Sequence, residues 1–283
     1  MANIKFEYVK GFEQATDWVL LPSTYIVIRV DGKGFTKFSE AHGFEKPNDK
    51  RALDLVNECA KAVMRDFPVV LAYGESDEYS FVLNKDATLY EARQQALEQT
   101  RAGPSTAAQA DYRCRASKII STITSCFTGN YVRLWSQFLP DTPLGWPPVF
   151  DGRAVCFPTL TVLKDYLAWR QADTHINNQY NTCYWCLVKA GKPPAEAQAI
   201  IKSSDTAFKN ELLFTQFGIN YAQLPEQFRK GSTVLGRPVR SVVKYREDGT
   251  PVERDRVQEV LLHCDIIGDA FWQQHQQLLG LTD

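Results

Sequence analysis

The order in which apolar runs of strand type and helix type follow one another constrains the fold of this chain most strongly. β-Branched and aromatic runs over 24–30, 69–73, 78–83 and 149–157 predict four strands. Apolar residues at helical spacing over 47–67 and 112–138 predict one helix between the first two strands and one between the last two. The resulting βαββαβ order is that of the ferredoxin-like unit, an α+β fold with an antiparallel sheet.

Two aspartates border the strands that this fold places at the centre of its sheet. Asp31 follows the first strand and Asp77 precedes the third, and these strands are antiparallel neighbours in a ferredoxin-like unit. We therefore expect both carboxylates at one rim. Magnesium prefers oxygen ligands, so Asp31, Asp77 and the Gly32 carbonyl form a candidate metal site. Asp and Gly are also common in turns, and the same pattern is compatible with two plain turns.

The second part of the chain is predicted to be mainly helical. Helical spacing runs over 163–190, 194–203 and 206–216, and a segment with six basic residues follows over 229–246. We expect a first domain over 1–158, with a polar loop insertion over 97–110, and a helical extension over 159–283 packed on it. The basic segment could contact RNA phosphates or could be a solvated surface.

Charge and cysteine usage limit the environment and the partners of the chain. A formal net charge of −1 means that a nucleic acid must be bound through a local basic patch. Seven scattered cysteines indicate reduced thiols without disulfides, as in a cytoplasmic or nuclear protein. The N-terminal segment has neither a signal-peptide pattern nor a long apolar run. Cys183 and Cys186 have no second ligand pair for zinc, so we interpret them as part of a helix core.

Several longer segments carry a resemblance to a known family. They are Arg29-Val-Asp-Gly-Lys-Gly-Phe, Glu45-Lys-Pro-Asn-Asp, Ala72-Tyr-Gly-Glu-Ser-Asp-Glu-Tyr-Ser-Phe, Arg115-Ala-Ser-Lys and the long segment over 169–182. In this order they resemble the eukaryotic tRNA-histidine guanylyltransferase family. The similarity extends from residue 6 to about residue 231, about four-fifths of the chain, which a single short motif would not give.

The resemblance implies a fold, a reaction and partners. The expected fold is a polymerase-type palm followed by a helical extension, and the expected assembly is a homotetramer. The family uses two Mg²⁺ ions and ATP to adenylylate the 5′-monophosphate of tRNA(His). The 3′-hydroxyl of GTP then attacks the activated end, and pyrophosphate is removed.

The resemblance also implies roles for individual residues. Asp31, Asp77 and Glu78 are expected to be catalytic, with Asp31, Gly32 and Asp77 as metal ligands. The expected nucleotide-binding residues are Asp31, Gly32, Lys33, Gly34, Phe35, Thr36, Lys46, Asp49, Ser76, Asp77 and Lys118. Lysines suit a triphosphate because they are compact point charges, although Lys46 and Lys118 would also fit solvated helix faces. Thr36 stands where many family members have histidine, so a histidine contact there is absent in this chain.

Contacts to tRNA are expected from scattered polar and basic residues. These are Arg29, His175, Asn178, Lys209, Arg229 and Lys230. Spacings of three and four place His175, Asn178 and Asn181 near one helix face. Such a polar ridge could bind RNA or a neighbouring subunit.

Two other classes of function share parts of this pattern. A nucleotide cyclase or a 5′-end RNA repair polymerase would use the same carboxylates on the same palm. A non-catalytic ferredoxin-like RNA-binding module would read bases with aromatic side chains on its sheet. The third strand opens with Ser76-Asp77-Glu78 instead of the Gly-aromatic pattern of such modules, and acidic residues there would repel RNA unless metal ions intervene.

Overall fold

The computed structural model describes residues 5–16, 18–21, 23–83, 115–246 and 250–279, and the predicted loop insertion over 97–110 lies outside them. The strands are β1 (Tyr25–Gly32), β2 (Val69–Glu75), β3 (Glu78–Leu83), β4 (Phe150–Phe157), β5 (Ser232–Tyr245) and β6 (Pro251–Leu262). The helices are η1 (Glu7–Val9), α1 (Lys10–Thr16), α2 (Phe35–Ala41), α3 (Lys50–Asp66), α6 (Ala116–Phe138), α7 (Leu160–Lys189), α8 (Pro194–Ile201), α9 (Thr206–Phe217), η2 (Tyr221–Gln223), α10 (Glu226–Lys230) and α11 (Asp269–Leu279).

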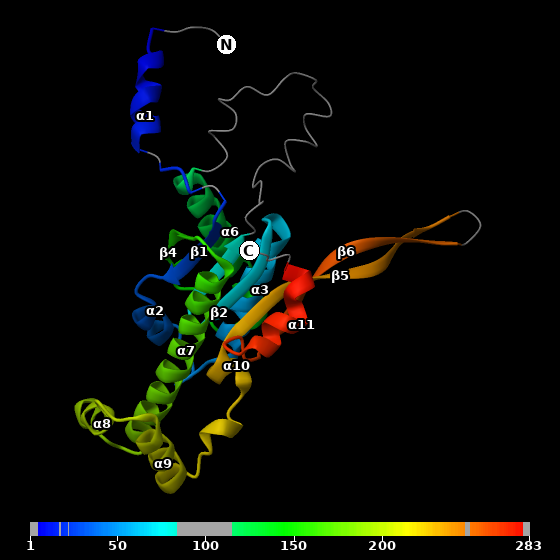
Figure 1. Cartoon of the computed structure of the whole chain (residues 1–283). Coiled ribbons are helices and arrows are strands. Elements are labelled where there is room, and N and C mark those ends of the chain that lie inside the picture. The colour runs from blue at the N-terminus through cyan, green and yellow to red at the C-terminus, as the bar shows by residue number, and fades with distance from the viewer. Residues whose placement is uncertain (1–4, 17, 22, 84–114, 247–249, 280–283) are drawn as a thin grey trace.

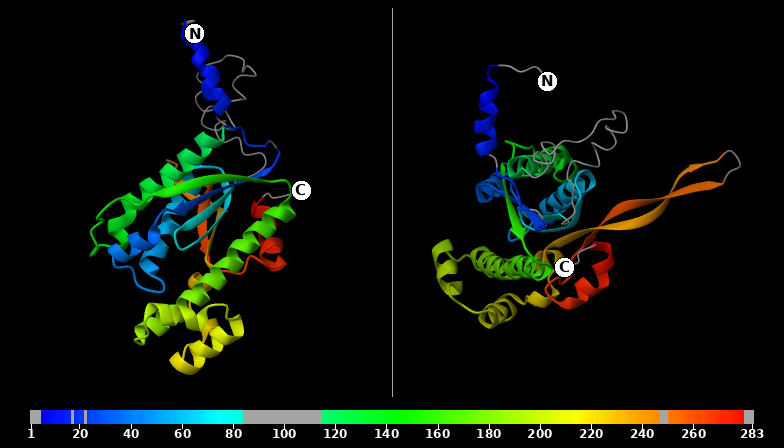
Figure 2. Two further views of the ribbon diagram at one scale, coloured as in Figure 1. Left: turned by 90° about the vertical axis from the view of Figure 1, so that its left-hand side faces the viewer. Right: turned by 45° about the horizontal axis from the view of Figure 1, so that its top comes forward.

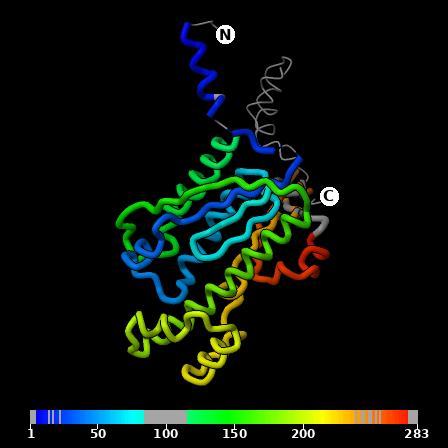
Figure 3. The backbone as a smooth tube through the Cα atoms, turned by 60° about the vertical axis from the view of Figure 1, so that its left-hand side comes forward, coloured from blue at the N-terminus to red at the C-terminus, as the bar shows by residue number. Residues whose placement is uncertain are grey.

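The strands form one sheet in the order β4-β1-β3-β2-β5-β6, with every pair antiparallel (Figures 1 and 3). Its first four strands have the predicted ferredoxin-like order, and β1 and β3 are neighbours as expected. The fold is α+β and polymerase palm-like, which confirms the predicted class.

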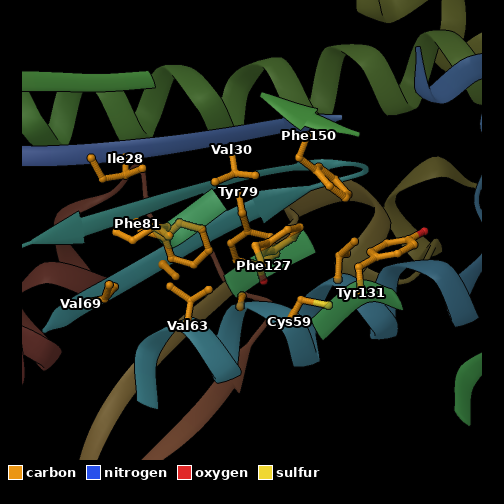
Figure 4. Packing of buried hydrophobic residues seen from close by; sticks show 14 of the residues in the cluster. Ile28, Val30, Cys59, Val63, Val69, Tyr79, Phe81, Phe127, Tyr131 and Phe150 are labelled. Carbon is orange, nitrogen blue, oxygen red and sulfur yellow. The ribbon is translucent and has the colours of Figure 1, made fainter. Parts of the chain in front are cut away.

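Helices α3 and α6 cover one face of the sheet. The buried stripe of α3 includes Leu55, Cys59 and Val63, and it packs against Tyr79 and Phe81 of β3 (Figure 4). Asp49 begins α3 as its N-cap, because its side chain accepts a hydrogen bond from the amide of Arg51. Each fully buried side chain of this size contributes about 1.5–3 kcal/mol of hydrophobic free energy, so this layer holds the strands of the rim in register.

Helix α7 crosses the opposite face of the sheet (Figure 2, left). Its Leu163 and Leu167 are buried against Tyr25 and Val27 of β1. The C-terminal half of α7 extends beyond the sheet, where its Cys183 and Leu187 pack against α8 and α9. The three helices match the predicted helical extension, and none of the described helices is long and apolar enough to span a membrane.

The basic segment after residue 229 differs from the sequence-based expectation, which gave it no strand. Most of it forms β5, which pairs with β2 and, over its whole length, with β6. The hairpin projects beyond the helices as a two-stranded ribbon (Figures 1 and 2). The sheet therefore continues into residues that were assigned to the extension, and the division at 158/159 stays a prediction.

Candidate active site

The end of β1 meets the turn between β2 and β3 at one rim of the sheet. Asp31 is the register partner of Glu78, and the amide of Gly32 donates a hydrogen bond to the carbonyl oxygen of Asp77 over 3.1 Å. Ser76 takes a left-handed conformation with φ +49°, which lets the two-residue turn place Asp77 beside β1. The antiparallel pairing thus brings the two predicted carboxylates, 46 positions apart, to one place.

Gly32 permits the close approach of Asp77. A Cβ atom at position 32 would lie 2.5 Å from the Asp77 Oδ2 atom and would also overlap the ring of Phe35. Gly34 has φ +68°, a conformation that glycine adopts without strain, and it turns the chain from β1 into α2. At both glycines of the predicted Asp-Gly-Lys-Gly turn, a side chain would therefore be disfavoured, by lack of space at Gly32 and by the backbone conformation at Gly34.

Burial disfavours the negative charge of the Asp77 carboxyl group. Burial raises its pKa to about 6, a hydrogen bond from Ser76 opposes the shift, and the charge of Asp31 adds to it. Within the described residues, Asp77 has no ion-pair partner. A cation beside Asp77 would reverse this penalty.

Two arginines hold the other carboxylates of the rim. Arg29 donates to Asp31 at 2.8 Å and to Glu78, and Arg170 of α7 lies 2.9 Å from Glu78 and 3.4 Å from Glu75. Burial raises the pKa of Glu75 to about 7 and raises that of Glu78, with the two arginines opposing the shift at Glu78. The predicted tRNA contact of Arg29 does not fit this position, because its guanidinium is turned into the carboxylate cluster.

A cavity of about 690 Å³ opens beside this rim. It lies between the start of α2, the segment that leads into α3, the Ser76–Asp77 turn, and the C-terminal half of α7. The predicted nucleotide-binding residues that line it are Gly32, Gly34, Phe35, Thr36, Lys46, Asp49, Ser76 and Asp77. A mixed wall of backbone, aromatic rings and a few polar groups is typical of small-ligand sites.

Comparison with known proteins agrees with this geometry. A family model described as tRNAHis guanylyltransferase matches residues 6–158, and one described as Thg1 C terminal domain matches residues 161–268. The chain belongs to the tRNA(His) guanylyltransferase family. It is 45% identical to a probable tRNA(His) guanylyltransferase of Dictyostelium discoideum over 99% of both chains. As a member of this family it is a nucleotidyltransferase.

Solved structures of guanylyltransferases have the same fold. The crystal structure of tRNA(His) guanylyltransferase from Saccharomyces cerevisiae is 43% identical and aligns with a TM-score of 0.69, over 82% of this chain and 93% of that chain. A bacterial Thg1-like protein in complex with ATP is 21% identical and aligns with a TM-score of 0.67, over 98% and 99% of the two chains. At that identity the second similarity concerns the fold alone.

The remaining nucleotide-binding residues expected from the guanylyltransferase resemblance lie outside the cavity. Asp31 is half-buried beside Arg29, and Lys33 is exposed, with its amide donating to the Val149 carbonyl at 2.8 Å. Lys118 lies in the first turn of α6 and does not line the cavity. Any contact of Lys118 with a nucleotide therefore requires a phosphate position outside this cavity.

Lys46 and Asp49 differ in how many of their charged interactions are already made within the protein. The Lys46 Nζ atom donates to Ser39 Oγ at 2.8 Å and lies 6.0 Å from the centre of the Trp185 ring, without an ion pair to any described residue. Burial favours a higher pKa for Asp49, but hydrogen bonds from Arg51 and from the Glu45 amide lower it overall. Lys46 is thus a charge available to a ligand, whereas Asp49 is mainly a helix cap.

Aromatic side chains of the cavity were missed by the sequence interpretation. Tyr180, Tyr184 and Trp185 of α7 line it, together with Asn181, which was predicted to contact RNA or a neighbouring subunit. The Cys183 side chain is fully buried against α8 and α9, as predicted for the core, while the two aromatic residues after it face the cavity. The spacing of Tyr180 and Tyr184 was the available signal, because residues four apart share a helix face.

The predicted tRNA contacts in the extension are only partly accessible. Asn178 is buried between Asn48 and Tyr221, and buried Lys209 donates to the carbonyl of Ser204, so neither position fits an RNA contact. His175 is half-buried near Tyr221, and burial together with nearby Arg229 lowers its pKa. Half-buried Arg229 and Lys230 bond the Leu224 carbonyl and Glu226, respectively.

The donors at the rim fit a magnesium ion. Magnesium usually takes one or two carboxylates and completes its shell with water and substrate phosphates. The structure offers the carboxylate of Asp77, which none of the described cationic side chains contacts, next to the Gly32 backbone and Asp31. No group of three or more His, Cys, Asp or Glu gathers around a point in the described part of the chain. The remaining ligands would therefore come from the substrate.

Proposed function

We propose that this protein adds a guanosine to the 5′ end of tRNA(His) in three steps. ATP adenylylates the 5′-monophosphate of the tRNA and releases pyrophosphate. The 3′-hydroxyl of GTP then attacks the activated phosphorus with loss of AMP, and hydrolysis removes pyrophosphate from the triphosphate of the added guanosine. One observation supports this most directly. Asp77 and Lys46 line the same cavity, and neither forms an ion pair with a residue that the structure describes, so a nucleoside triphosphate with Mg²⁺ complements both.

We assign two Mg²⁺ ions to Asp31, Asp77 and the Gly32 carbonyl, with Glu78 as a supporting carboxylate. When bound, such ions favour ionisation of an attacking hydroxyl and neutralise a triphosphate. Arg29 and Arg170 keep Glu78 beside Asp31, and Gly32 leaves room for Asp77. Lys46, Ser76 and Thr36 orient the triphosphate, and the rings of Phe35, Tyr184 and Trp185 cover the apolar parts of the nucleotide.

We propose that the protein acts on tRNA(His) as a homotetramer in the cytoplasm or the nucleus. The half-buried basic residues Arg229 and Lys230 stay candidates for RNA contact, together with His175. These assignments follow from membership of the family, and sedimentation of the protein with and without tRNA would test the assembly.

Replacing Lys46 by alanine should impair the use of nucleotides. Loss of a charge-assisted contact of about 1.5–3 kcal/mol corresponds to an increase in KM of roughly 10–100-fold for ATP or GTP. Steady-state kinetics at saturating tRNA would measure it. Lys37→Ala is the matched control, because Lys37 is exposed on α2 and does not line the cavity. Unchanged KM values for both nucleotides in Lys46→Ala would remove Lys46 from the site.

The phosphate state of the tRNA tests the order of the reaction. A 5′-monophosphorylated tRNA(His) should require ATP for guanosine addition, whereas a 5′-triphosphorylated one should not, because its terminal phosphates already provide the leaving group. Labelled GTP and mapping of the labelled end would measure both. Label at the 3′ end or equal dependence on ATP would contradict the proposed direction, and a cyclic nucleotide product would indicate a cyclase.

A further inference from the structure

The hydroxyl group of Tyr131 is buried without a partner. Tyr131 lies on α6 with no solvent exposure, and its ring packs 6.0 Å from the centre of Phe35 and 5.5 Å from that of Phe150. Its Oη atom has no hydrogen-bond partner within the described residues, and the side chain lines the cavity. Figure 4 shows the hydroxyl directed away from the other core residues.

Two buried tyrosines of the neighbouring sheet, by contrast, have hydrogen-bond partners for their hydroxyl groups. Tyr79 donates to Asn57 Oδ1 at 2.7 Å, and Tyr73 bonds Thr174 and the Lys230 carbonyl. A buried hydroxyl without a partner destabilises the folded protein, because it loses its hydrogen bonds to water and gains none in return. Phenylalanine would fill the same space as Tyr131 without this cost. The unpaired hydroxyl therefore indicates a group that a ligand brings.

The position of Tyr131 identifies the part of a nucleotide that it meets. Tyr131 lines the same cavity as Asp77 and Asp49, and its ring packs against Phe35, which follows the Gly32–Gly34 turn of the rim. Burial raises the pKa of its hydroxyl, so the group stays protonated at neutral pH. Asp77 belongs to the phosphate end of the cavity and Asp49 to the start of α3. A nucleotide bound with its phosphates at Asp77 places its sugar next along the cavity.

The neighbouring polar groups Ser39 and Asp49 are not available to bind the sugar hydroxyls of a nucleotide. Ser39 accepts from Lys46 and donates to the Thr36 carbonyl, and both oxygens of Asp49 accept hydrogen bonds from Arg51. Tyr131 is thus a free donor and acceptor in this part of the wall. A sugar hydroxyl is both a donor and an acceptor and matches it.

We propose that the Tyr131 hydroxyl binds the 2′-hydroxyl of the ribose in this cavity and so makes the site prefer ribonucleotides to deoxyribonucleotides. The proposal rests on the proposed nucleotide-binding function of the cavity. Tyr131 acts as a specificity-determining residue, because a 2′-deoxynucleotide leaves its hydroxyl buried and unpaired. Discrimination by a buried polar partner is stronger than discrimination by shape alone.

The test measures the affinity of the full-length protein for GTP and for 2′-deoxy-GTP by titration calorimetry with Mg²⁺. The wild type should bind GTP about 5–20-fold more tightly than 2′-deoxy-GTP. Tyr131→Phe should bind GTP about as weakly as 2′-deoxy-GTP, with a melting temperature equal to or above that of the wild type. Tyr79→Phe is the matched control, because it loses the bond to Asn57 and some stability but should keep the GTP preference.

Three outcomes would overturn the assignment. They are a wild type without preference, a preference that Tyr131→Phe retains, and an equal loss of affinity for both nucleotides, which would place the hydroxyl on the base or the phosphates. Guanosine addition to tRNA(His) is assayed in parallel. Preferential GTP binding that depends on Tyr131 without guanosine addition would support this proposal and refute the proposed function.

Discussion

Asp77→Asn is expected to reduce guanosine addition at least about 10²-fold and, at the same time, to stabilise the metal-free protein. Under the proposed metal assignment, activity falls because an amide cannot replace the carboxylate as a ligand of the metal at the reacting phosphate. Stability rises because Asn avoids a charge that the fold disfavours. Ionising a carboxyl group whose pKa has risen from 3.8 to about 6 costs about 3 kcal/mol.

The sign of the pH dependence follows from the direction of the pKa shift. Since the folded protein binds the proton of Asp77 more tightly than the unfolded chain, the unfolding free energy of the wild type falls as pH rises from 3.8 to about 6. Allowing for partial solvent screening of this half-buried group, the variant should be about 1–3 kcal/mol more stable above about pH 7 and have no advantage below about pH 4. Thermal melting across this pH range with EDTA would measure it.

Added Mg²⁺ should stabilise the wild type relative to Asp77→Asn, opposite to the order of stability expected with EDTA. The wild type should melt at a higher temperature as Mg²⁺ is added, because an ion that binds only the folded state stabilises it, whereas Asp77→Asn should respond little. Asp165→Asn is the matched control, since Asp165 is exposed on α7 and should keep both activity and the Mg²⁺ response. A folded Asp77→Asn protein with near wild-type turnover would refute the metal assignment.

The order of strands 1 to 4 and the shared rim of Asp31 and Asp77 were predictable because they depend on local signals. Each strand is a short β-branched or aromatic run bounded by turn residues, and the antiparallel pairing of β1 and β3 follows from the order alone. The position of Arg29 could also have been found. Residues two apart on a strand point to one face, so the alternation of side chains along the strand would have placed Arg29 beside Asp31.

The β5–β6 ribbon could not be found in the same way. A two-stranded ribbon that projects into solvent buries little on either face, so its sequence lacks the alternation of apolar and polar residues that marks a half-buried strand. Val242, Tyr245 and Val257 are exposed there, and charged residues are frequent throughout. The basic composition of 229–246 indicated a surface segment but did not predict that its backbone would form a strand.

The walls of the cavity depend on packing between distant elements. Tyr131 reaches the cavity because α6 lies against α2 and β4, and Trp185 does so because α7 extends past the sheet beside the segment before α3. No local pattern fixes these angles between elements. Helical periodicity therefore assigned these residues to apolar faces without showing which face would line a cavity.

Gly32→Ala is expected to reduce guanosine addition at least about 10²-fold through a steric effect at the rim. The new methyl group would lie 2.5 Å from Asp77 Oδ2, so either Asp77 or the β1 backbone must move. A displacement of about 1 Å in a catalytic group can cost about 10²-fold in rate. Turnover at saturating substrates, together with Mg²⁺-dependent melting, would measure the loss of activity and of metal binding in the same protein.

Gly129→Ala separates this local clash from a general effect of replacing glycine. Gly129 lies on an exposed face in the middle of α6, and nothing would lie within 4 Å of its new Cβ atom. The substitution should stabilise the protein by about 0.5–1 kcal/mol through helix propensity and leave turnover unchanged. If Gly32→Ala also kept its turnover and its response to Mg²⁺, the rim would tolerate the extra methyl group. The close approach of Gly32 to Asp77 would then have no part in catalysis.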